Sequence, residues 1–235
     1  MTTNWKIEPV TADDGPAVAR NTGGAFWEEP MWKLQWRSDV TQDFLIEQLL
    51  KRQASRLLRE RAALRHQKAV DPESGRLVGY ARWRLPDNRT ITPDGTPEWA
   101  EAQIPDVGED RKKELDTIAA EAWWDPRTDV DELDDDNDAV KDRVVAGRSF
   151  LELEFLAVHP DNKGKGIGSS LVESGIRQAE KMGLPIIVVC YKAAQGVYRR
   201  LGFVEVDRIT KDDTAYGGTG KYSWYYMVYD EAKTD

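Results

Sequence analysis

A glycine-rich turn with the sequence NKGKGIGSS follows a strand-like run in the second half of the chain. Main-chain N–H groups at the start of a helix have no partner inside the helix, and the aligned peptide dipoles place partial positive charge there. Anions bind at such helix ends, and Gly164, Gly166 and Gly168 would let the backbone approach a bulky phosphate group closely. Lys163 and Lys165 add positive charge beside the glycines. The turn is therefore predicted to bind a pyrophosphate group.

Two familiar phosphate-binding motifs do not fit this turn. A P-loop requires a Lys-Ser or Lys-Thr pair after its glycines, and neither pair follows here. A dinucleotide-binding turn has the spacing G-x-G-x-x-G and an acidic residue at the end of the next strand. This turn has the spacing G-x-G-x-G, and the next strand-like run, PIIVVCYK, ends without an acid. From spacing alone, a tight strand-to-helix turn that binds no ligand remains an alternative interpretation.

The residues around the turn resemble the acyl-CoA-binding motif of the GNAT superfamily of N-acetyltransferases. That motif reads Gln/Arg-x-x-Gly-x-Gly/Ala and follows a strand that ends in Val-x-Pro. Val158 and Pro160 match the end of the strand, and Gly166 and Gly168 match the two glycines. Lys163 stands at the Gln/Arg position. This departure matters only if the side chain, and not the backbone N–H, is required there.

A second resemblance lies further along the chain, in the run AAQGVYRRLGF. It is similar to the superfamily signature Tyr-x-x-x-Gly-Phe, and Tyr198, Gly202 and Phe203 match that signature. The two signatures have the separation expected in the superfamily, with a strand between them, and the motif-level likeness covers residues 149–205. The resemblance implies a GNAT-like α/β fold, in which a mixed and splayed central sheet is flanked by helices.

For the donor substrate, the resemblance implies acetyl-CoA. The strand before the glycines would hydrogen-bond the pantetheine arm through Leu156 and Val158, with Ala157 between them. The pyrophosphate would lie on the turn made by Lys163, Gly164, Lys165, Gly166, Ile167, Gly168 and Ser169. The glycines would then expose main-chain amides to the diphosphate of CoA, and the lysines would offset its charge.

Acetyl transfer to an amine needs an acid for the leaving thiolate and a base for the attacking amine. Tyr198 resembles the superfamily's thiolate-protonating tyrosine, and a phenol can donate a proton to a developing thiolate. A core tyrosine is the alternative interpretation.

The base is predicted from the strand before the turn. Period-two alternation places Glu152, Glu154, Leu156 and Val158 on one face of that strand. A carboxylate in an apolar cleft is a stronger base than one in water. We therefore predict Glu154 as the general base, with Glu152 as the second choice. Alternatively, the two glutamates only line a pocket for a cationic substrate, or they are solvated.

Aromatic residues gather in two segments that, in the superfamily, lie beside the acceptor. The segment FWEEPMWKLQW contributes Trp27 and Trp32, and the last strand-like run, YSWYYMVYD, contributes Tyr225. Aromatic rings can stack on a planar group or surround an amine. We therefore predict that these three residues bind the acceptor, and packing in the core is the alternative for each of them.

Several secondary-structure elements must position these residues. Strands are predicted at residues 5–10, 149–158 and 184–191, in the runs FVEVDRIT and YSWYYMVYD, and in a hairpin around residues 71–75. Helices are predicted after Thr11 up to a break at Gly23 and Gly24, from Asp39 or Thr41, and over residues 165–182 and 193–202. Short connections between alternating strands and helices indicate an α/β domain whose middle strands are parallel.

Residues 86–148 differ from the rest of the chain. They begin Pro-rich and polar, contain a predicted helix in EDRKKELDTIAAEAWW, and then become strongly acidic. We interpret residues 1–235 as one domain that carries this segment as a partly helical insertion. An EF-hand loop needs a central glycine, and no glycine lies between Asp125 and Asp142. The acidic run is therefore predicted to be a solvated face, and no metal site is predicted.

Composition limits the partners of the chain. It has 235 residues, 33 Lys and Arg, 42 Asp and Glu, and a formal net charge of −9, which argues against a nucleic-acid surface because such a surface needs a basic face. No apolar stretch approaches the ~20 residues of a membrane span, and the N-terminal run MTTNWKIEPV lacks the layout of a signal peptide. The single cysteine, Cys190, excludes an internal disulfide. We expect a cytoplasmic monomer or homodimer.

The resemblance therefore implies an acetyl-CoA-dependent N-acetyltransferase that moves the acetyl group directly to the primary amine of a small molecule. Acetylation of a protein or peptide amine is the first alternative, because a groove for either is hard to see in a sequence. A GNAT-like domain that binds acyl-CoA without catalysis, as a sensor, is the second alternative.

Overall fold

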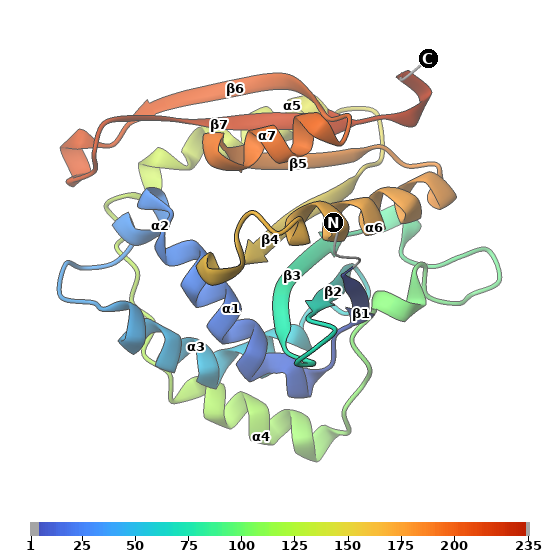
Figure 1. Ribbon diagram of the computed structural model, residues 1–235, viewed down its shortest axis with the longest axis horizontal. Coiled ribbons are helices and arrows are strands. Elements are labelled where there is room, and N and C mark those ends of the chain that lie inside the picture. The colour runs from blue at the N-terminus through green and yellow to red at the C-terminus, as the bar shows by residue number, and fades with distance from the viewer. Residues whose placement is uncertain (1–4, 234–235) are drawn as a thin grey trace.

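The computed structural model describes residues 5–233, so the first four residues of the N-terminal run considered above lie outside the described residues. Seven strands form one sheet with the order β1-β2-β3-β4-β5-β7-β6. Their bounds are β1 (Lys6–Pro9), β2 (Leu64–Val70), β3 (Leu77–Arg84), β4 (Leu151–Val158), β5 (Ile186–Tyr191), β6 (Val204–Asp212) and β7 (Lys221–Tyr229). In Figure 1, β5, β6 and β7 occupy the upper part, β1, β2 and β3 the lower part, and β4 lies between them.

Helices cover both faces of the sheet. On one face, α6 (Ile167–Met182) packs on β1 to β4, and α7 (Lys192–Arg200) packs on β5 and β7. On the other face, α1 (Gly15–Trp27) packs on β3 and β4, and α5 (Asp135–Val145) packs on β6. The helix α3 (Gln42–Leu57) lies against α1, α4 (Glu109–Ala120) lies against α3, and the short α2 (Pro30–Leu34) follows α1. Thr41 caps α3 by accepting a hydrogen bond from the backbone N–H of Phe44 at 3.2 Å.

The two central strands separate after a short parallel pairing. The register joins Leu151 to Ile186 and continues to Leu153 and Val188, where it ends. Both strands run on beyond this point, and every other neighbouring pair among the described strands is antiparallel. The sheet is therefore mixed and splayed at its centre, which confirms the predicted α/β fold with flanking helices.

A β-bulge in β4 changes which residues share a face. Arg82 of β3 pairs with Phe155 and the next residue of β3 pairs with Leu153, so Glu154 is the extra residue on β4. A bulge interrupts period-two alternation, and here it places Leu156 and Val158 on the α6 face together with Leu153. The prediction that Glu152 and Glu154 share a face with Leu156 and Val158 is therefore wrong.

The predicted break of the first helix at Gly23 and Gly24 is also wrong, because α1 continues through both residues. A Cβ added at Gly23 would lie 2.7 Å from the side chain of Ile46, and one added at Gly24 would lie 2.6 Å from the ring of His159. These glycines therefore allow α1 to pack closely on α3 and on the turn after β4. Tertiary contact here outweighs the low helix propensity of glycine.

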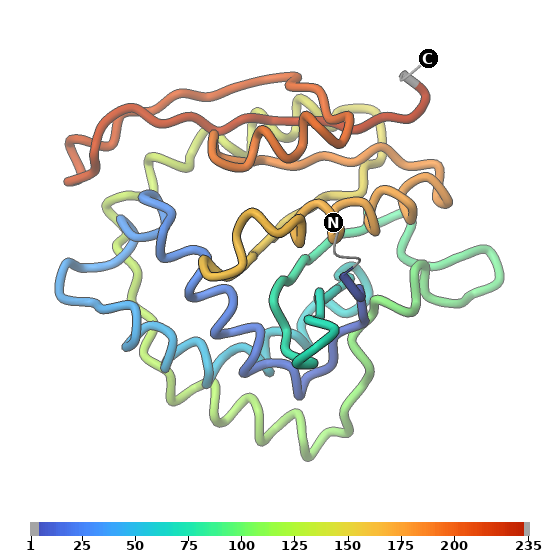
Figure 2. The backbone as a smooth tube through the Cα atoms, in the orientation of Figure 1, coloured from blue at the N-terminus to red at the C-terminus, as the bar shows by residue number. Residues whose placement is uncertain are grey.

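The segment 86–148, interpreted above as an insertion, contains α4 and α5 and runs around the outside of α3 (Figure 2). Its irregular part is held by small apolar contacts, since Val130 and Leu133 form a buried cluster with Met31 of α2. Tyr216 of the loop before β7 also joins this cluster and donates a hydrogen bond to Glu132 at 2.8 Å. Among residues 5–233, every helix is too short or too polar to span a lipid bilayer.

Replacing Gly175 by alanine is expected to destabilise the fold by about 1–3 kcal/mol, the usual cost of overpacking a core. An added Cβ would lie 2.1 Å from the ring of Trp83, so α6 would have to move away from β3. Urea denaturation would measure the loss. Gly196 is the matched control, because an added Cβ meets nothing closer than Arg200 at 3.5 Å. Gly196→Ala should gain about 0.5–1 kcal/mol from helix propensity, and equal effects at the two positions would contradict this account.

Candidate active site

A cavity of about 650 Å³ lies where β4 and β5 separate. Residues from both faces of β5 line it, namely Val188 and Cys190 on the α7 face and Val189 and Tyr191 on the α5 face. A cavity lined by both faces of one strand passes through the sheet. Its walls therefore bring together the turn before α6 on one face and the end of α1 on the other face.

The glycine turn exposes a series of main-chain donors to this cavity. Gly164 and Gly166 have φ angles of +77° and +79°, the left-handed region that favours glycine. Within the described part of the chain, the N–H groups of residues 164–169 donate to no carbonyl or side-chain oxygen, and regular helix bonding begins with Ser170 N to Gly166 O at 3.0 Å. The turn is held from outside by Trp5, whose Nε1 donates to Lys165 O at 2.9 Å.

These features fit the pyrophosphate group of CoA. Unpaired N–H groups at the first turn of α6 form an anion site, and Gly168, which lines the cavity, has no side chain beside them. A Cβ added at Gly168 would lie 3.7 Å from Leu156 and 3.8 Å from Val158. The narrow gap between α6 and β4 is thus kept free of side-chain atoms at this point, beside the two residues predicted to contact the pantetheine.

The two lysines of the turn make different contacts. Lys163 forms an ion pair with Glu28, and the Nζ atom of Lys165 donates to Asn162 Oδ1 at 2.8 Å. Lys163 lines the cavity, whereas Lys165 is not among the lining residues. A phosphate group that binds Lys163 would therefore compete with Glu28 for the ammonium group.

The end of β4 is fixed by α1. Asn21 is buried, and its side chain donates to Ala157 O at 3.0 Å and accepts from His159 N at 3.1 Å. The carbonyl oxygen of Ala157 therefore already has a protein donor, and Leu156 and Val158 line the cavity while Ala157 does not. His159 serves the turn, because its Nδ1 accepts from Asp161 N at 3.4 Å.

Tyr198 lines the cavity from α7. Its side chain packs edge-on against Phe203 with 5.4 Å between ring centroids, and it is 3% exposed. Burial raises the pKa of Tyr198 above its ordinary value, so the phenol keeps its proton at neutral pH. Cys190 lines the same cavity, and burial, with the charge of Glu205, raises the pKa of its thiol to about 12. The cysteine is therefore protonated and has no nucleophilic role.

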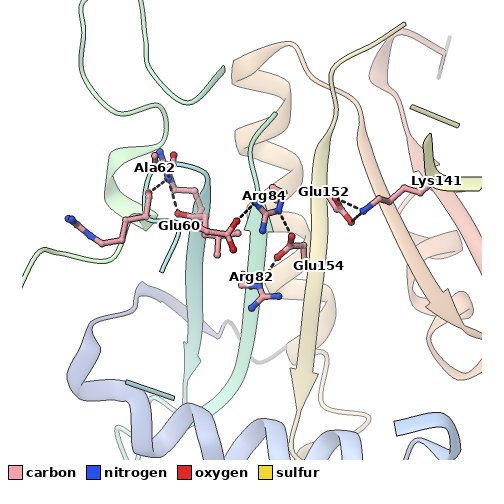
Figure 3. Close-up of polar contacts among 10 residues, drawn as sticks. Glu60, Ala62, Arg82, Arg84, Lys141, Glu152 and Glu154 are labelled. Atoms are coloured by element: carbon pink, nitrogen blue, oxygen red, sulfur yellow. Dashed lines mark hydrogen bonds and ion pairs between the residues drawn. The ribbon is translucent and has the colours of Figure 1, made fainter. Parts of the chain in front are cut away.

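Glu154 lies at the bulge and is held by two guanidinium groups (Figure 3). Arg84 donates to one of its oxygens and Arg82 Nε lies 2.7 Å from the other. Arg84 also pairs with Glu60 at 2.7 Å, so the carboxylate of Glu154 belongs to a chain of ion pairs. Both of its oxygens already face cations, which leaves Glu154 poorly suited to accept a proton from an amine.

Glu152, the second predicted base, points to α5. Lys141 Nζ lies 3.2 Å from its carboxylate, as Figure 3 shows, and Glu152 does not line the cavity. Its position follows from the ordinary alternation of β4, which is intact before the bulge and places Glu152 on the face opposite to Leu151 and Leu153. The structure therefore brings Glu154, but not Glu152, to the cavity.

Glu29 is a cavity residue that the sequence analysis did not select. It stands at the start of α2, and burial raises the pKa of its carboxyl, an effect partly opposed by the charge of Lys163. Among the described residues, no cation forms an ion pair with it and no side chain hydrogen-bonds to it. The sequence signal was present, since two glutamates sit inside the aromatic segment FWEEPMW. The prediction for this segment rested on its tryptophans and so did not include Glu29.

The three aromatic residues predicted to bind the acceptor do not line the cavity. Trp27 and Trp32 pack in a cluster with Trp36 and the tryptophans before α5, and Tyr225 is buried in the core on the α7 face. The aromatic residues that do line the cavity, besides Tyr198, are Phe26, Phe155, Tyr191 and Trp224. Phe26 and Trp224 are each next to a predicted residue in the sequence, and Tyr191 is the last residue of β5.

Comparison with known proteins places this site in a family. Residues 129–205 match the family model described as an acetyltransferase (GNAT) domain. A mycothiol acetyltransferase of Streptomyces coelicolor is 33% identical over 122 residues, which cover 48% of this chain and 39% of that protein. One of Streptomyces avermitilis is 33% identical over 109 residues, which cover 43% of this chain and 35% of that protein. The chain thus spans less than half the length of these curated relatives.

Solved structures resemble the whole chain. The histone acetyltransferase HPA2 and related acetyltransferase of Corynebacterium glutamicum has a TM-score of 0.59 and 20% identity, with 97% of each chain covered. The polyamine N-acetyltransferase of Drosophila melanogaster, which forms N-acetylagmatine, has a TM-score of 0.54 and 16% identity, with 96% of this chain and 99% of that chain covered. At these identities the likeness concerns the fold.

Proposed function

Since residues 129–205 carry a GNAT acetyltransferase domain, we propose that the protein transfers an acetyl group from acetyl-CoA to the primary amine of a small molecule. The observation that supports this most is the cavity through the splayed sheet, which joins the glycine turn on one face to Glu29 on the other. A donor held at the turn and an acceptor entering past Phe26 would meet inside it, near Tyr198 and Glu154.

The acid of the proposed reaction is Tyr198. Bound acetyl-CoA would supply the thioester and the thiolate leaving group. A phenol whose pKa is raised is a weak acid, but the same burial raises the pKa of the neighbouring Cys190 thiol to about 12. A thiolate released into this cavity is therefore a stronger base than a thiolate in water. Burial thus raises both the pKa of the Tyr198 phenol and the pKa of a thiol in this cavity, so the Tyr198 hydroxyl can still donate its proton to the leaving sulfur.

The base of the proposed reaction is Glu29, in preference to Glu154. Its carboxylate lines the acceptor end and has no ion-pair partner among the described residues, whereas Glu154 faces two guanidinium groups. Burial makes Glu29 a stronger base than a solvated carboxylate, and its negative charge attracts a cationic amine from which it can accept a proton. Glu154 would then help to shape the pocket through its hold on Arg82 and Arg84.

The acceptor is proposed to be a small molecule, as it is for the relatives named for mycothiol. A cavity of about 650 Å³ lies within the range of small-molecule sites, and it is shared with the donor. A carboxylate and the rings of Phe26, Tyr191 and Trp224 at its acceptor end suit a cationic amine with an apolar part. We further propose a cytoplasmic protein that acts as a monomer or homodimer.

Two measurements test the proposal together. Calorimetry with acetyl-CoA should give saturable binding at one site, and thiol release in the presence of an amine panel should identify at least one accepted primary amine. Saturable CoA binding without turnover on any amine or peptide would instead support a sensor. Turnover on peptide amines alone would replace the small-molecule acceptor with a protein acceptor.

Replacing Glu29 by glutamine is expected to lower kcat/KM by roughly 100-fold or more, the usual contribution of a positioned base. In the wild type, Glu29 is protonated below its raised pKa, so the acidic limb of the pH profile should lie above the ordinary glutamate range and should vanish in the variant. Because ionisation of Glu29 opposes folding as pH rises through its raised pKa, the neutral variant should lose no stability at pH 7. Thermal melts and pH-rate profiles measure the two effects.

Glu154→Gln is the comparison for this prediction. The variant leaves two guanidinium groups without their shared carboxylate, so stability and activity should fall together. A full loss of turnover in Glu154→Gln at unchanged stability, with Glu29→Gln still active, would return the base to Glu154.

A further inference from the structure

A second cavity, of about 520 Å³, lies between the end of α3 and α4. It shares no lining residue with the candidate active site. Four basic side chains line it, namely Arg52, Arg56, Arg59 and Lys112, against the acidic Glu60 and Asp116. A basic cavity stands out in a chain whose formal net charge is −9.

The four basic groups of this cavity have no acidic partners. Among the described residues, none of them forms an ion pair with a carboxylate, although the chain is rich in acids. The two acids in the wall are engaged by other groups, since Asp116 accepts from Ser55 at 2.6 Å and Glu60 pairs with Arg84 at 2.7 Å. The four basic groups outnumber the two acids of the wall, and Glu60 is already paired with Arg84, so the cavity keeps a net positive charge.

The arginines are held close together and partly out of water. Burial, reinforced by the charges of Arg56 and Arg59, lowers the pKa of Arg52 to about 10. Burial and the charges of Arg82 and Arg59 likewise lower the pKa of Arg56. Solvated surface arginines usually spread apart to avoid such repulsion. Here Arg52 is fixed instead, with its guanidinium 3.9 Å from the ring of Trp124.

We propose that this cavity is a binding site for a small organic phosphate. Guanidinium groups present pairs of N–H donors that match phosphate oxygens, and the three arginines follow one another at spacings of four and three residues, which places them on one side of α3 and of the turn after it. A bound phosphate would supply the missing negative charge. The cavity volume lies within the range of small-ligand sites and exceeds the needs of a bare phosphate ion.

The wall of this cavity is joined to the candidate active site. Glu60 lines the cavity, pairs with Arg84, and through Arg84 reaches Glu154, as Figure 3 shows. Glu60 also has a φ angle of +47°, an unusual conformation for a residue other than glycine. A ligand bound beside Glu60 would therefore lie next to the ion pairs that position Glu154. Such a ligand could alter those ion pairs, so the cavity suits an effector of the candidate active site.

The test uses calorimetry with inorganic pyrophosphate as the probe, on a Gly168→Val background in which the glycine turn is blocked. Saturable binding is expected there, and Arg59→Gln in the same background should weaken it by about tenfold or more, since each charge-assisted hydrogen bond contributes that much. Arg59 lies at the exposed turn after α3, so its loss leaves the fold in place. Lys51→Gln removes the same charge from α3 outside the cavity and should leave binding unchanged.

Two results would overturn the proposal. One is the absence of saturable pyrophosphate binding to Gly168→Val protein, and the other is equal affinity in Arg59→Gln and Lys51→Gln. Co-sedimentation with phosphatidic acid vesicles separates the two sources of the phosphate group. If the ligand is a free phosphate compound, the protein should not co-sediment with the vesicles. Vesicle binding without pyrophosphate binding would instead mean that the arginines bind a lipid headgroup. Because the probe is not acetyl-CoA, failure of this test leaves the proposed acetyl transfer unaffected.

Discussion

Replacing Gly168 by valine is expected to abolish saturable acetyl-CoA binding while the protein stays folded. The first added carbon would lie at ordinary contact distance, 3.7 Å from Leu156 and 3.8 Å from Val158, so the backbone need not move to accept a Cβ there. The branched side chain would then fill the space between α6 and the end of β4, beside the unpaired N–H groups of the turn. Loss of two or more charge-assisted hydrogen bonds, each worth about 1.5–3 kcal/mol, corresponds to more than 100-fold in affinity. Calorimetry measures it.

Ser170→Val is the matched control for this prediction. It places the same β-branched side chain in the first turn of α6, at a residue that does not line the cavity. Gly166→Val is a less informative variant, because Gly166 has a φ angle of +79° and valine there would strain the backbone whatever binds. Unchanged CoA affinity in Gly168→Val, together with normal folding, would show that the cofactor does not occupy this gap.

Much of the second half of the chain could be predicted because its signals are local. The glycine turn, the buried run at residues 184–191 and the short helix with Tyr198 are each set by residues within one element and its caps, and all three form as expected. The two signatures also agree with the family comparison, because residues 129–205 match the model of an acetyltransferase (GNAT) domain. Local chemistry and short connections were sufficient for these parts.

The bulge at Glu154 could not be predicted, because it is a property of two strands. Nothing within LELEFLAV shows that one residue of β4 has no partner in β3. An extra residue reverses the facing of all that follow it, so a single missed bulge separated Leu156 and Val158 from the glutamates. The ion pairs of Glu154 with Arg82 and Arg84 depend on the same pairing, and Arg84 lies 70 residues from Glu154 in the sequence.

The remaining differences between the sequence-based predictions and the structure depend on which residues are buried in the fold. Gly23 and Gly24 remain helical because α3 and His159 press against them, and no sequence window contains those contacts. The choice among aromatic residues also depended on which side of a strand or helix faces the cavity. Trp224 and Tyr225 are neighbours, yet Trp224 lines the cavity and Tyr225 lies in the core. Glu29 became a candidate base only through the same tertiary burial.

Replacing Tyr198 by phenylalanine is expected to lower kcat by roughly 100-fold or more, with CoA affinity and stability nearly unchanged. The ring keeps its packing on Phe203. Within the described residues, no protein group hydrogen-bonds to the hydroxyl, so its removal breaks no structural contact. If Tyr198 has only a structural role, the variant should therefore keep its turnover. A large loss of turnover is expected only if the hydroxyl donates a proton. Thiol release measures kcat, and calorimetry measures CoA affinity.

Tyr225→Phe supplies the control, because Tyr225 is also a buried tyrosine, and its ring lies in the core and does not line the cavity. Its activity should remain near the wild-type value, which would also set aside its predicted contact with the acceptor. A loss of CoA affinity in Tyr198→Phe as large as the loss of turnover would assign the hydroxyl to binding. Full activity in Tyr198→Phe would mean that water, and not this phenol, protonates the leaving thiolate.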